Sequence, residues 1–159
     1  METFWHYVLT FLISMVPVIE LRGAIPIGYY AFDLPIWPVV IVSILGNLAP
    51  VPFLILWGGK VLRWLATYPR LGKPFRWILK RGEKKTAKMQ HGLFWGLFLF
   101  VAIPLPGTGA WTGSLVAITL GEDLKRAFLP IALGVLGAGA IILTIFYAFP
   151  ELFVAWFGR

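Results

Sequence analysis

The sequence predicts an all-α integral membrane protein, built as an inverted repeat of a re-entrant hairpin followed by a transmembrane helix. Hydrophobic residues make up 59% of the 159 residues and charged residues only 13%. An ordinary soluble domain has about 25% charged residues, so this chain is too apolar for that class. Two long uncharged runs predict membrane spans, and two apolar runs with Pro and Gly near their centres predict hairpins. We expect one membrane domain over residues 1–159.

The predicted membrane spans are residues 34–59 and 127–150, which contain no charged side chain. At ~1.5 Å rise per residue, each is long enough to cross ~30 Å of hydrocarbon. The first span contains four prolines. Membrane helices tolerate such breaks when neighbouring groups satisfy the freed carbonyls. In the second span, Gly134, Gly137 and Gly139 predict a close packing face against the first.

The predicted hairpins are residues 3–32 and 89–121. A straight helix of ~30 residues would be ~45 Å long, which is too long for one crossing. Pro and Gly break the helix in each run, in "RGAIPIG" and in "IPLPGTGAWTG". Each run is therefore predicted to enter the membrane, turn at mid-depth and leave on the same side.

Weak internal similarity relates the two halves of the chain. "RGAI" from Arg22 aligns with "TGAW" from Thr108, and "WPVVIVSILGN" from Trp37 aligns with "LPIALGVLGAG" from Leu129. The chain is thus predicted to consist of a first repeat at residues 1–59, a basic linker at 60–88 and a second repeat at 89–159. Hairpins that enter from opposite faces have tips that meet near the midplane, where inverted-repeat transporters bind their substrates.

The net charge of +7 is concentrated in the linker. Ten of the fourteen Lys and Arg residues lie between Lys60 and Lys88. In so apolar a chain this cluster predicts a cytoplasmic loop beside anionic lipid, so we expect membrane lipids and no nucleic acid as partners. Both chain ends are then outside. Because four short segments enclose little volume, we also expect a homo-oligomer.

Glu20 and Arg22 lie within the first predicted hairpin and are the leading candidates for a functional site. An ionisable group inside the membrane costs ~2.5–3.5 kcal/mol on insertion, which favours a functional role. Arg22 stays charged and can hold a phosphate or carboxylate. Glu20 can take up a proton, because burial disfavours the charged carboxylate. The alternative is a static pair, which requires a broken turn, since residues two apart on a regular helix do not face each other.

The Gly- and Pro-rich tips predict backbone that approaches a ligand and helix N–H groups that face an anion. Close helix packing without a ligand is the alternative. Asn47 either lines the cavity or bonds another helix, and two distant histidines, His6 and His91, predict no metal site. We expect no cofactor. The candidate residues for substrate binding and transport are Glu20, Arg22, Gly23, Pro26, Asn47, Pro104, Pro106, Gly107, Thr108, Gly109 and Thr112.

The motifs "ELRGAIP" and "PLPGTGAWTG" resemble the prokaryotic small multi-drug export family, which is similar to the DedA/VTT group of membrane proteins. The resemblance implies a prokaryotic plasma-membrane protein with two facing re-entrant loops. It also implies transport or flipping of lipids, such as polyprenyl phosphates and phospholipids, with proton or sodium coupling. By position, Glu20 and Arg22 would match an acidic residue and an embedded arginine of the first loop. Pro104, Pro106 and Gly107 would match the second loop, which here lacks the charged residues that DedA proteins tend to carry.

The sequence thus predicts a transporter or flippase of an amphipathic substrate, namely a lipid with an anionic phosphate head group, with coupling to protons through Glu20. One alternative is an exporter of small lipophilic cationic drugs, in which Glu20 alternates between proton and drug. Another is a structural or assembly protein of the membrane, in which Glu20 and Arg22 join helices. No pattern of an enzyme active site is found in the sequence.

Overall fold

The protein is described from a computed structural model, which covers residues 1–67, 90–105, 108–149 and 151. Within these ranges the regular structure is entirely helical. The elements are α1 (Glu2–Ser14), α2 (Glu20–Pro26), the π-helix η1 (Ile27–Ala31), α3 (Ile36–Leu48), α4 (Pro50–Ala66), α6 (Gln90–Ala102), α7 (Ala110–Thr119) and α8 (Leu124–Ala148).

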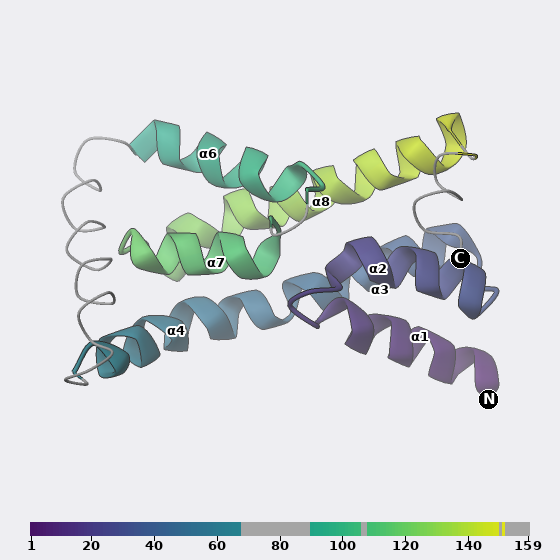
Figure 1. Ribbon diagram of the computed structural model, residues 1–159, viewed down its shortest axis with the longest axis horizontal. Coiled ribbons are helices and arrows are strands. Elements are labelled where there is room, and N and C mark those ends of the chain that lie inside the picture. The colour runs from purple at the N-terminus through teal and green to yellow at the C-terminus, as the bar shows by residue number, and fades with distance from the viewer. Residues whose placement is uncertain (68–89, 106–107, 150, 152–159) are drawn as a thin grey trace.

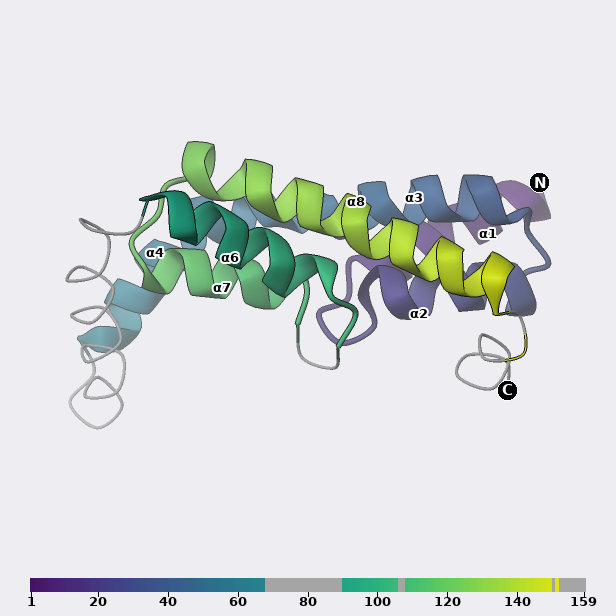
Figure 2. The ribbon, with the colours of Figure 1, turned by 90° about the horizontal axis from the view of Figure 1, so that it is seen from above.

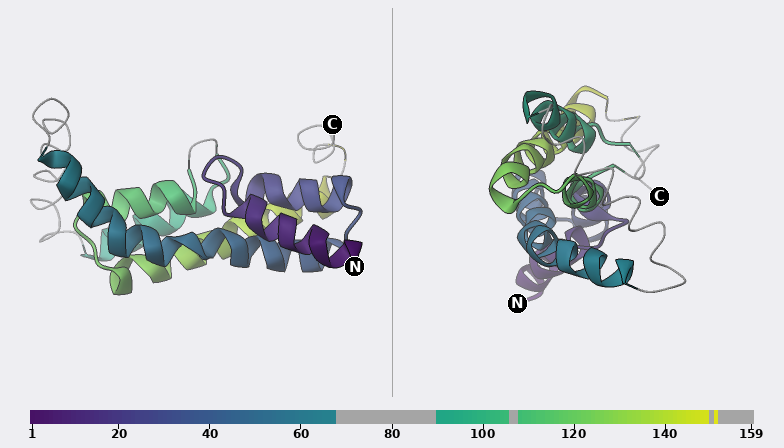
Figure 3. Two further views of the ribbon diagram at one scale, coloured as in Figure 1. Left: turned by 90° about the horizontal axis from the view of Figure 1, so that it is seen from below. Right: turned by 90° about the vertical axis from the view of Figure 1, so that its left-hand side faces the viewer.

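Two long helical segments run along the molecule and carry two pairs of short helices (Figure 1). The helices α1 and α2 pack on α3 at one end, while α6 and α7 pack on α8 at the other (Figures 2 and 3). The helix α8 crosses to contact α3, and α7 contacts α4. The order of two short helices followed by a long helical segment therefore occurs twice along the chain.

The two predicted spans are confirmed as helices of membrane length. Residues Ile36–Val61 and Leu124–Ala148 are apolar and long enough to cross a bilayer. The first changes from α3 to α4 at Ala49, where Pro50 cannot donate a backbone hydrogen bond. The second begins earlier than predicted because Asp123 caps it, accepting a hydrogen bond from the Arg126 backbone N–H at 3.0 Å.

The break in the first pair of short helices precedes the predicted position. The chain leaves the helix at residues 15–19, between α1 and α2, rather than in "RGAIPIG". Pro17 explains this, since it lacks an N–H and disfavours helical backbone at Val16. Pro26 consequently lies inside a helical segment, where η1 follows it. In the second pair, α6 ends at Ala102 and α7 begins at Ala110, so the chain leaves the helix within the predicted motif "IPLPGTGAWTG".

Apolar side chains cover much of the outer surface, whereas several polar side chains are buried. On α3, Trp37, Ile41 and Leu45 are 58%, 57% and 55% exposed. Asn47 and Ser43 on the same helix are fully buried. A soluble protein exposes few such contiguous apolar faces, so this distribution indicates that lipid surrounds the helices.

The glycines of α8 face two different neighbours. A Cβ at Gly134 would lie 2.6 Å from the Cβ of Val101 on α6, and Gly137 faces α6 as well. Only Gly139 faces the first span, where Ile44 lies closest to it. The prediction that all three glycines contact the first span is wrong for the first two. At 3.6 residues per turn, Gly139 lies about 140° around the helix from Gly134, so one neighbour cannot contact both.

Gly46 allows α1 to lie directly against α3. A Cβ at this position would be 2.4 Å from the Phe11 carbonyl oxygen, a backbone atom that cannot move without the helix. We therefore predict that Gly46→Ala lowers the free energy of unfolding by about 1–3 kcal/mol, as overpacking does elsewhere. The measurement is thermal unfolding of the purified protein in detergent, followed by tryptophan fluorescence.

Gly96→Ala on α6 is the matched control, because no atom lies within 4 Å of a Cβ there. Alanine is favoured over glycine inside a helix by about 1 kcal/mol, so this variant should be as stable as the parent or more stable. Equal unfolding temperatures for the two variants would contradict the close α1–α3 contact.

Candidate functional site

The two helix breaks meet at the centre of the molecule. In Figure 2 the loop before α2 lies beside the loop that joins α6 to α7. Glu20 and Arg22, in the first turn of α2, reach from the first pair of helices to residues 103–111 of the second. We call this contact region, formed by Glu20, Arg22 and residues 103–105 and 108–111, the junction.

Glu20 caps the N-terminus of α7. Its carboxylate oxygen Oε1 accepts a hydrogen bond from the Trp111 backbone N–H at 3.2 Å, and the side chain is only 4% exposed. The N-cap residue of α7 is Gly109, which has no side chain to fill this role. A carboxylate from another helix therefore satisfies the free N–H groups, and its charge is favourable beside the positive end of the helix dipole.

Gly109 makes room for this carboxylate. A Cβ at Gly109 would lie 1.9 Å from Glu20 Oε2, and the backbone φ angle of +150° also disfavours any other residue. Glu20 itself has a φ of +51°, which is uncommon for a residue other than glycine. The local backbone on both sides is thus arranged around the contact between Glu20 and α7.

Arg22 binds the loop that follows α6. Its guanidinium donates to the carbonyl oxygen of Leu105, to that of Ile103 at 3.4 Å and to Thr108 Oγ1 at 3.0 Å. Two of these acceptors are carbonyls just beyond the C-terminus of α6, the end of a helix that attracts cations. The buried Nε atom of Arg22 has no hydrogen-bond partner.

The hydrogen bonds of Glu20 and Arg22 therefore go to different helix ends rather than to each other. The sequence left open a static pair held together across a broken turn. The break lies before Glu20, however, and both residues belong to α2. Because residues two apart point to different sides of a helix, each side chain finds its own partner in the second pair of helices.

Of the candidates in the second break, Thr108 and Gly109 form part of the junction. The Thr108 hydroxyl contacts Arg22 and lies 2.8 Å from the Ile103 carbonyl oxygen, to which it donates. Pro104 lies half-buried in the same break. Pro106 and Gly107 lie outside the described residues.

Three other candidates make contacts within their own pair of helices. Thr112 donates to the Gly109 carbonyl oxygen at 3.3 Å, within α7. Gly23 packs against Ile19, whose Cγ2 would lie 2.4 Å from a Cβ at Gly23. Pro26 is buried at the end of α2. The contacts of Gly23 and Pro26 lie within the first pair of helices, and Thr112 contacts the junction only through the Gly109 carbonyl oxygen.

Asn47 is fully buried on α3, and both polar atoms of its amide lack a hydrogen-bond partner. The hydroxyl of Ser43, one turn earlier on the same face, is also buried without a partner. A buried polar group left unsatisfied costs about 1–3 kcal/mol, so such groups in native proteins usually bind water or a ligand. The alternative in which Asn47 bonds another helix is not what the structure shows.

Trp111 also belongs to the junction. In the alignment of "RGAI" with "TGAW" it matches Ile25, and the sequence predicted no role for it. Its indole Nε1 donates to the Met15 carbonyl oxygen at 2.9 Å, while its backbone N–H donates to Glu20. The sequence signal for this role was a tryptophan directly after a glycine-rich break, because a buried indole N–H needs a hydrogen-bond partner.

Among the described residues, no group of three His, Asp or Glu side chains could hold a metal ion.

The described residues are all helical or irregular, and two of their helices are long and apolar enough to cross a bilayer, which defines the class as integral membrane protein. Residues 20–141, more than half of the chain, match the family model described as small multi-drug export protein. The chain belongs to this family. No curated protein and no solved structure shows significant similarity to it. The relation to the DedA/VTT group stays a prediction.

We predict that Gly109→Ala destabilises the protein more than Gly121→Ala does. Both glycines have a positive φ, +150° and +76°, but only at Gly109 would a Cβ collide with Glu20. Backbone strain costs about 1–3 kcal/mol at either site. Loss of the cap on α7 adds about 1 kcal/mol at Gly109 alone. The measurement is chemical unfolding in detergent.

A double-mutant cycle with Glu20→Ala tests the cause. Once Glu20 is removed, Gly109→Ala should cost no more than Gly121→Ala, which gives a coupling energy of about 1 kcal/mol. Strictly additive effects would mean that Glu20 does not bind at the N-terminus of α7.

We predict that Asn47→Leu stabilises the protein by about 1–3 kcal/mol, because an apolar side chain of similar shape removes two unsatisfied polar atoms. Asn47→Asp is the control, and it should destabilise because it buries a charge without a partner. Thermal unfolding in detergent is again the measurement. A less stable Asn47→Leu protein would show that the amide is hydrogen-bonded after all.

Proposed function

We propose that the protein is a transporter or flippase of amphipathic molecules with an anionic, phosphate-bearing head group, and that the junction is its binding site. One observation carries this proposal: the Glu20 carboxylate accepts a hydrogen bond from Trp111 N–H at the N-terminus of α7. Free N–H groups and the helix dipole make such a terminus a binding site for anions. The protein's own carboxylate thus stands where the phosphate of a substrate would bind.

We infer that the pairs α1–α2 and α6–α7 are re-entrant hairpins of an inverted repeat. The helix α1 has 13 residues and so is ~20 Å long, short of the ~30 Å of hydrocarbon. In Figure 1, α1 begins at the end of the molecule where α8 ends, while α4 ends where α6 begins. This arrangement supports entry of the hairpins from opposite faces. The positive-inside rule then makes the basic linker cytoplasmic.

In this proposal the junction has two states. In the first, Glu20 caps α7 and Arg22 binds the carbonyls after α6. In the second, Glu20 withdraws, a phosphate takes its place at the N–H groups, and Arg22 exchanges carbonyl oxygens for phosphate oxygens. A guanidinium binds phosphate through two parallel hydrogen bonds, which favours this exchange. The substrate selects the second state because it binds only there.

Protonation of Glu20 favours the exchange of its carboxylate for the substrate phosphate at the N-terminus of α7. A protonated Glu20 has no negative charge to place beside the helix dipole and is a weaker hydrogen-bond acceptor. Protonation therefore favours release of α7 and entry of the anion. Apolar tails of the substrate stay in lipid, beside the exposed apolar side chains of the helices.

An exporter of lipophilic cations is the second candidate, and the family description favours it. Glu20 would then exchange α7 for the cationic substrate. Arg22 lies in the same helical turn and would repel a second cation, whereas it attracts a phosphate. This difference is why we favour the anionic head group.

Transport in liposomes tests the proposal. We predict that Arg22→Ala lowers the translocation rate of a fluorescent anionic phospholipid at least about tenfold, because a charge-assisted hydrogen bond contributes more than that factor. Arg22→Lys should recover part of the rate, because lysine keeps the positive charge but cannot donate the two parallel hydrogen bonds of a guanidinium. Glu20→Gln should abolish the dependence of the rate on a pH gradient. Lys60→Ala, which removes an exposed cation from α4, is the control and should leave the rate unchanged.

Efflux of a cationic dye from the same liposomes separates the candidates. Dye efflux that Glu20→Gln abolishes, without any lipid translocation, would favour the cation exporter. If Arg22→Ala and Glu20→Gln only lower the unfolding temperature, and the parent protein moves neither probe, the junction is structural and the transport proposal is wrong.

A further inference from the structure

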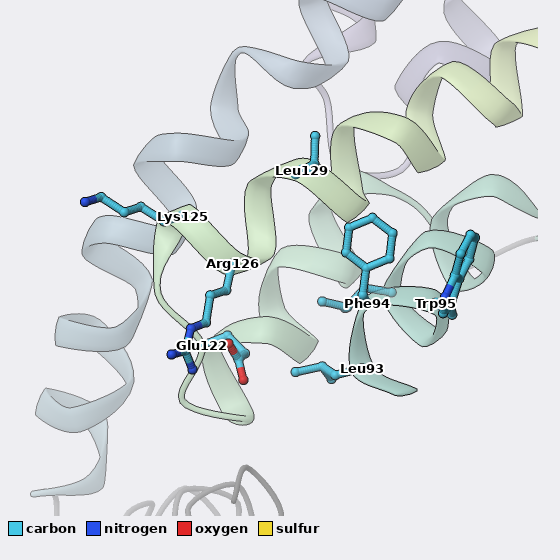
Figure 4. A pocket seen from close by; sticks show the side chains of 8 residues that line it. Leu93, Phe94, Trp95, Glu122, Lys125, Arg126 and Leu129 are labelled. Carbon is cyan, nitrogen blue, oxygen red and sulfur yellow. The ribbon is translucent and has the colours of Figure 1, made fainter. Parts of the chain in front are cut away.

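A second candidate site lies far from the junction, where α6 begins and α7 turns into α8. A cavity of about 400 Å³ opens there, and Figure 4 shows side chains from both of its walls. One wall is apolar and comes from α6 and α8, with Phe94 and Leu97 on α6. The other is polar and comes from Glu122, in the turn before α8, and from Arg126, in the first turn of α8.

The cavity lies at the boundary of the membrane. The helix α8, which is long and apolar enough to cross a bilayer, carries Lys125 and Arg126 in its first turn beside the cavity, and this places that end of the helix at the membrane surface. Trp95, which is 60% exposed, also lines the cavity. Tryptophan and basic residues concentrate at the level of lipid head groups. The cavity therefore faces phospholipid head groups at its mouth and acyl chains along its apolar wall.

The mouth of the cavity carries charges of both signs. In Figure 4 the side chain of Arg126 extends toward Glu122, while Lys125 extends away from Phe94 and Trp95. Glu122 is only 9% exposed, whereas Arg126 is exposed. The carboxylate of Asp123 is engaged in capping α8. A buried carboxylate and an accessible guanidinium are thus the two groups that an occupant would meet.

We propose that this cavity binds a zwitterionic phospholipid with a primary ammonium group, such as phosphatidylethanolamine. The lipid phosphate accepts hydrogen bonds from Arg126, its ammonium donates to Glu122, and an acyl chain lies against Phe94 and Leu97. This inference does not depend on the transport proposal, because none of these residues belongs to the junction.

The charges of the cavity discriminate among head groups. Phosphatidylglycerol has a phosphate but no cation, so it would leave the buried Glu122 carboxylate uncompensated. The quaternary ammonium of phosphatidylcholine carries a positive charge but has no N–H to donate. Only a primary ammonium offers both the charge and the hydrogen bonds that a carboxylate accepts.

Native mass spectrometry of the full chain, released from detergent with defined lipids, tests the proposal. Phosphatidylethanolamine should be retained about tenfold more strongly than phosphatidylcholine or phosphatidylglycerol of the same acyl chains, the factor expected for one charge-assisted hydrogen bond. Glu122→Gln should abolish this preference. Arg126→Gln should weaken retention of all three lipids, because each has a phosphate. The helix cap is kept in this variant, since the backbone N–H of residue 126 still donates to Asp123. Glu2→Gln is the matched control and should change nothing.

Equal retention of the three lipids by the parent protein would mean that the cavity holds acyl chains only, and would overturn the proposal without any variant. An unchanged preference in Glu122→Gln would overturn it as well. Arg22→Ala separates this proposal from the previous one. It should slow transport at least about tenfold yet leave the lipid preference intact, so that either proposal can fail while the other stands.

Discussion

The structure depends on one electrostatic arrangement, in which two side chains of α2 cap the broken ends of the second pair of helices. A helix end that is buried away from water leaves N–H or C=O groups that need another partner. Glu20 supplies a negative charge to the N-terminus of α7, and Arg22 supplies a positive charge to the carbonyls after α6. Each charge matches the sign that its helix end requires.

The same contacts are the basis for the function proposed for the junction. A cap provided by a side chain from another helix can be exchanged for a ligand of the same charge, because the cap is not part of the capped helix. The unpaired amide of Asn47 and the free Nε of Arg22 are further polar groups that the fold leaves unsatisfied at the centre of the molecule. Groups of this kind lower stability and are typical of sites that bind something.

The junction and the cavity at the start of α8 differ in how their charges are held. At the junction, Glu20 and Arg22 are bound to backbone groups, so the proposed substrate would have to displace them. At the cavity, Glu122 and Arg126 line an open volume. The first arrangement fits a substrate that passes through, and the second fits a lipid that stays bound at the edge of the protein.

The sequence by itself determined the two long spans, a break between α6 and α7, and the choice of Glu20 and Arg22 as the charges to explain, because absence of charge, Pro and Gly content and the cost of burying a charge are local properties. It located the first break too late, since "RGAIPIG" is rich in Gly and Pro but Pro17 acts first. Only the tertiary structure decided the partners of the two charges, the role of Trp111 and the neighbours of Gly134 and Gly139. Those contacts join residues 86 and 91 positions apart at the junction, and the packing of helices, which no local pattern encodes, brings them together.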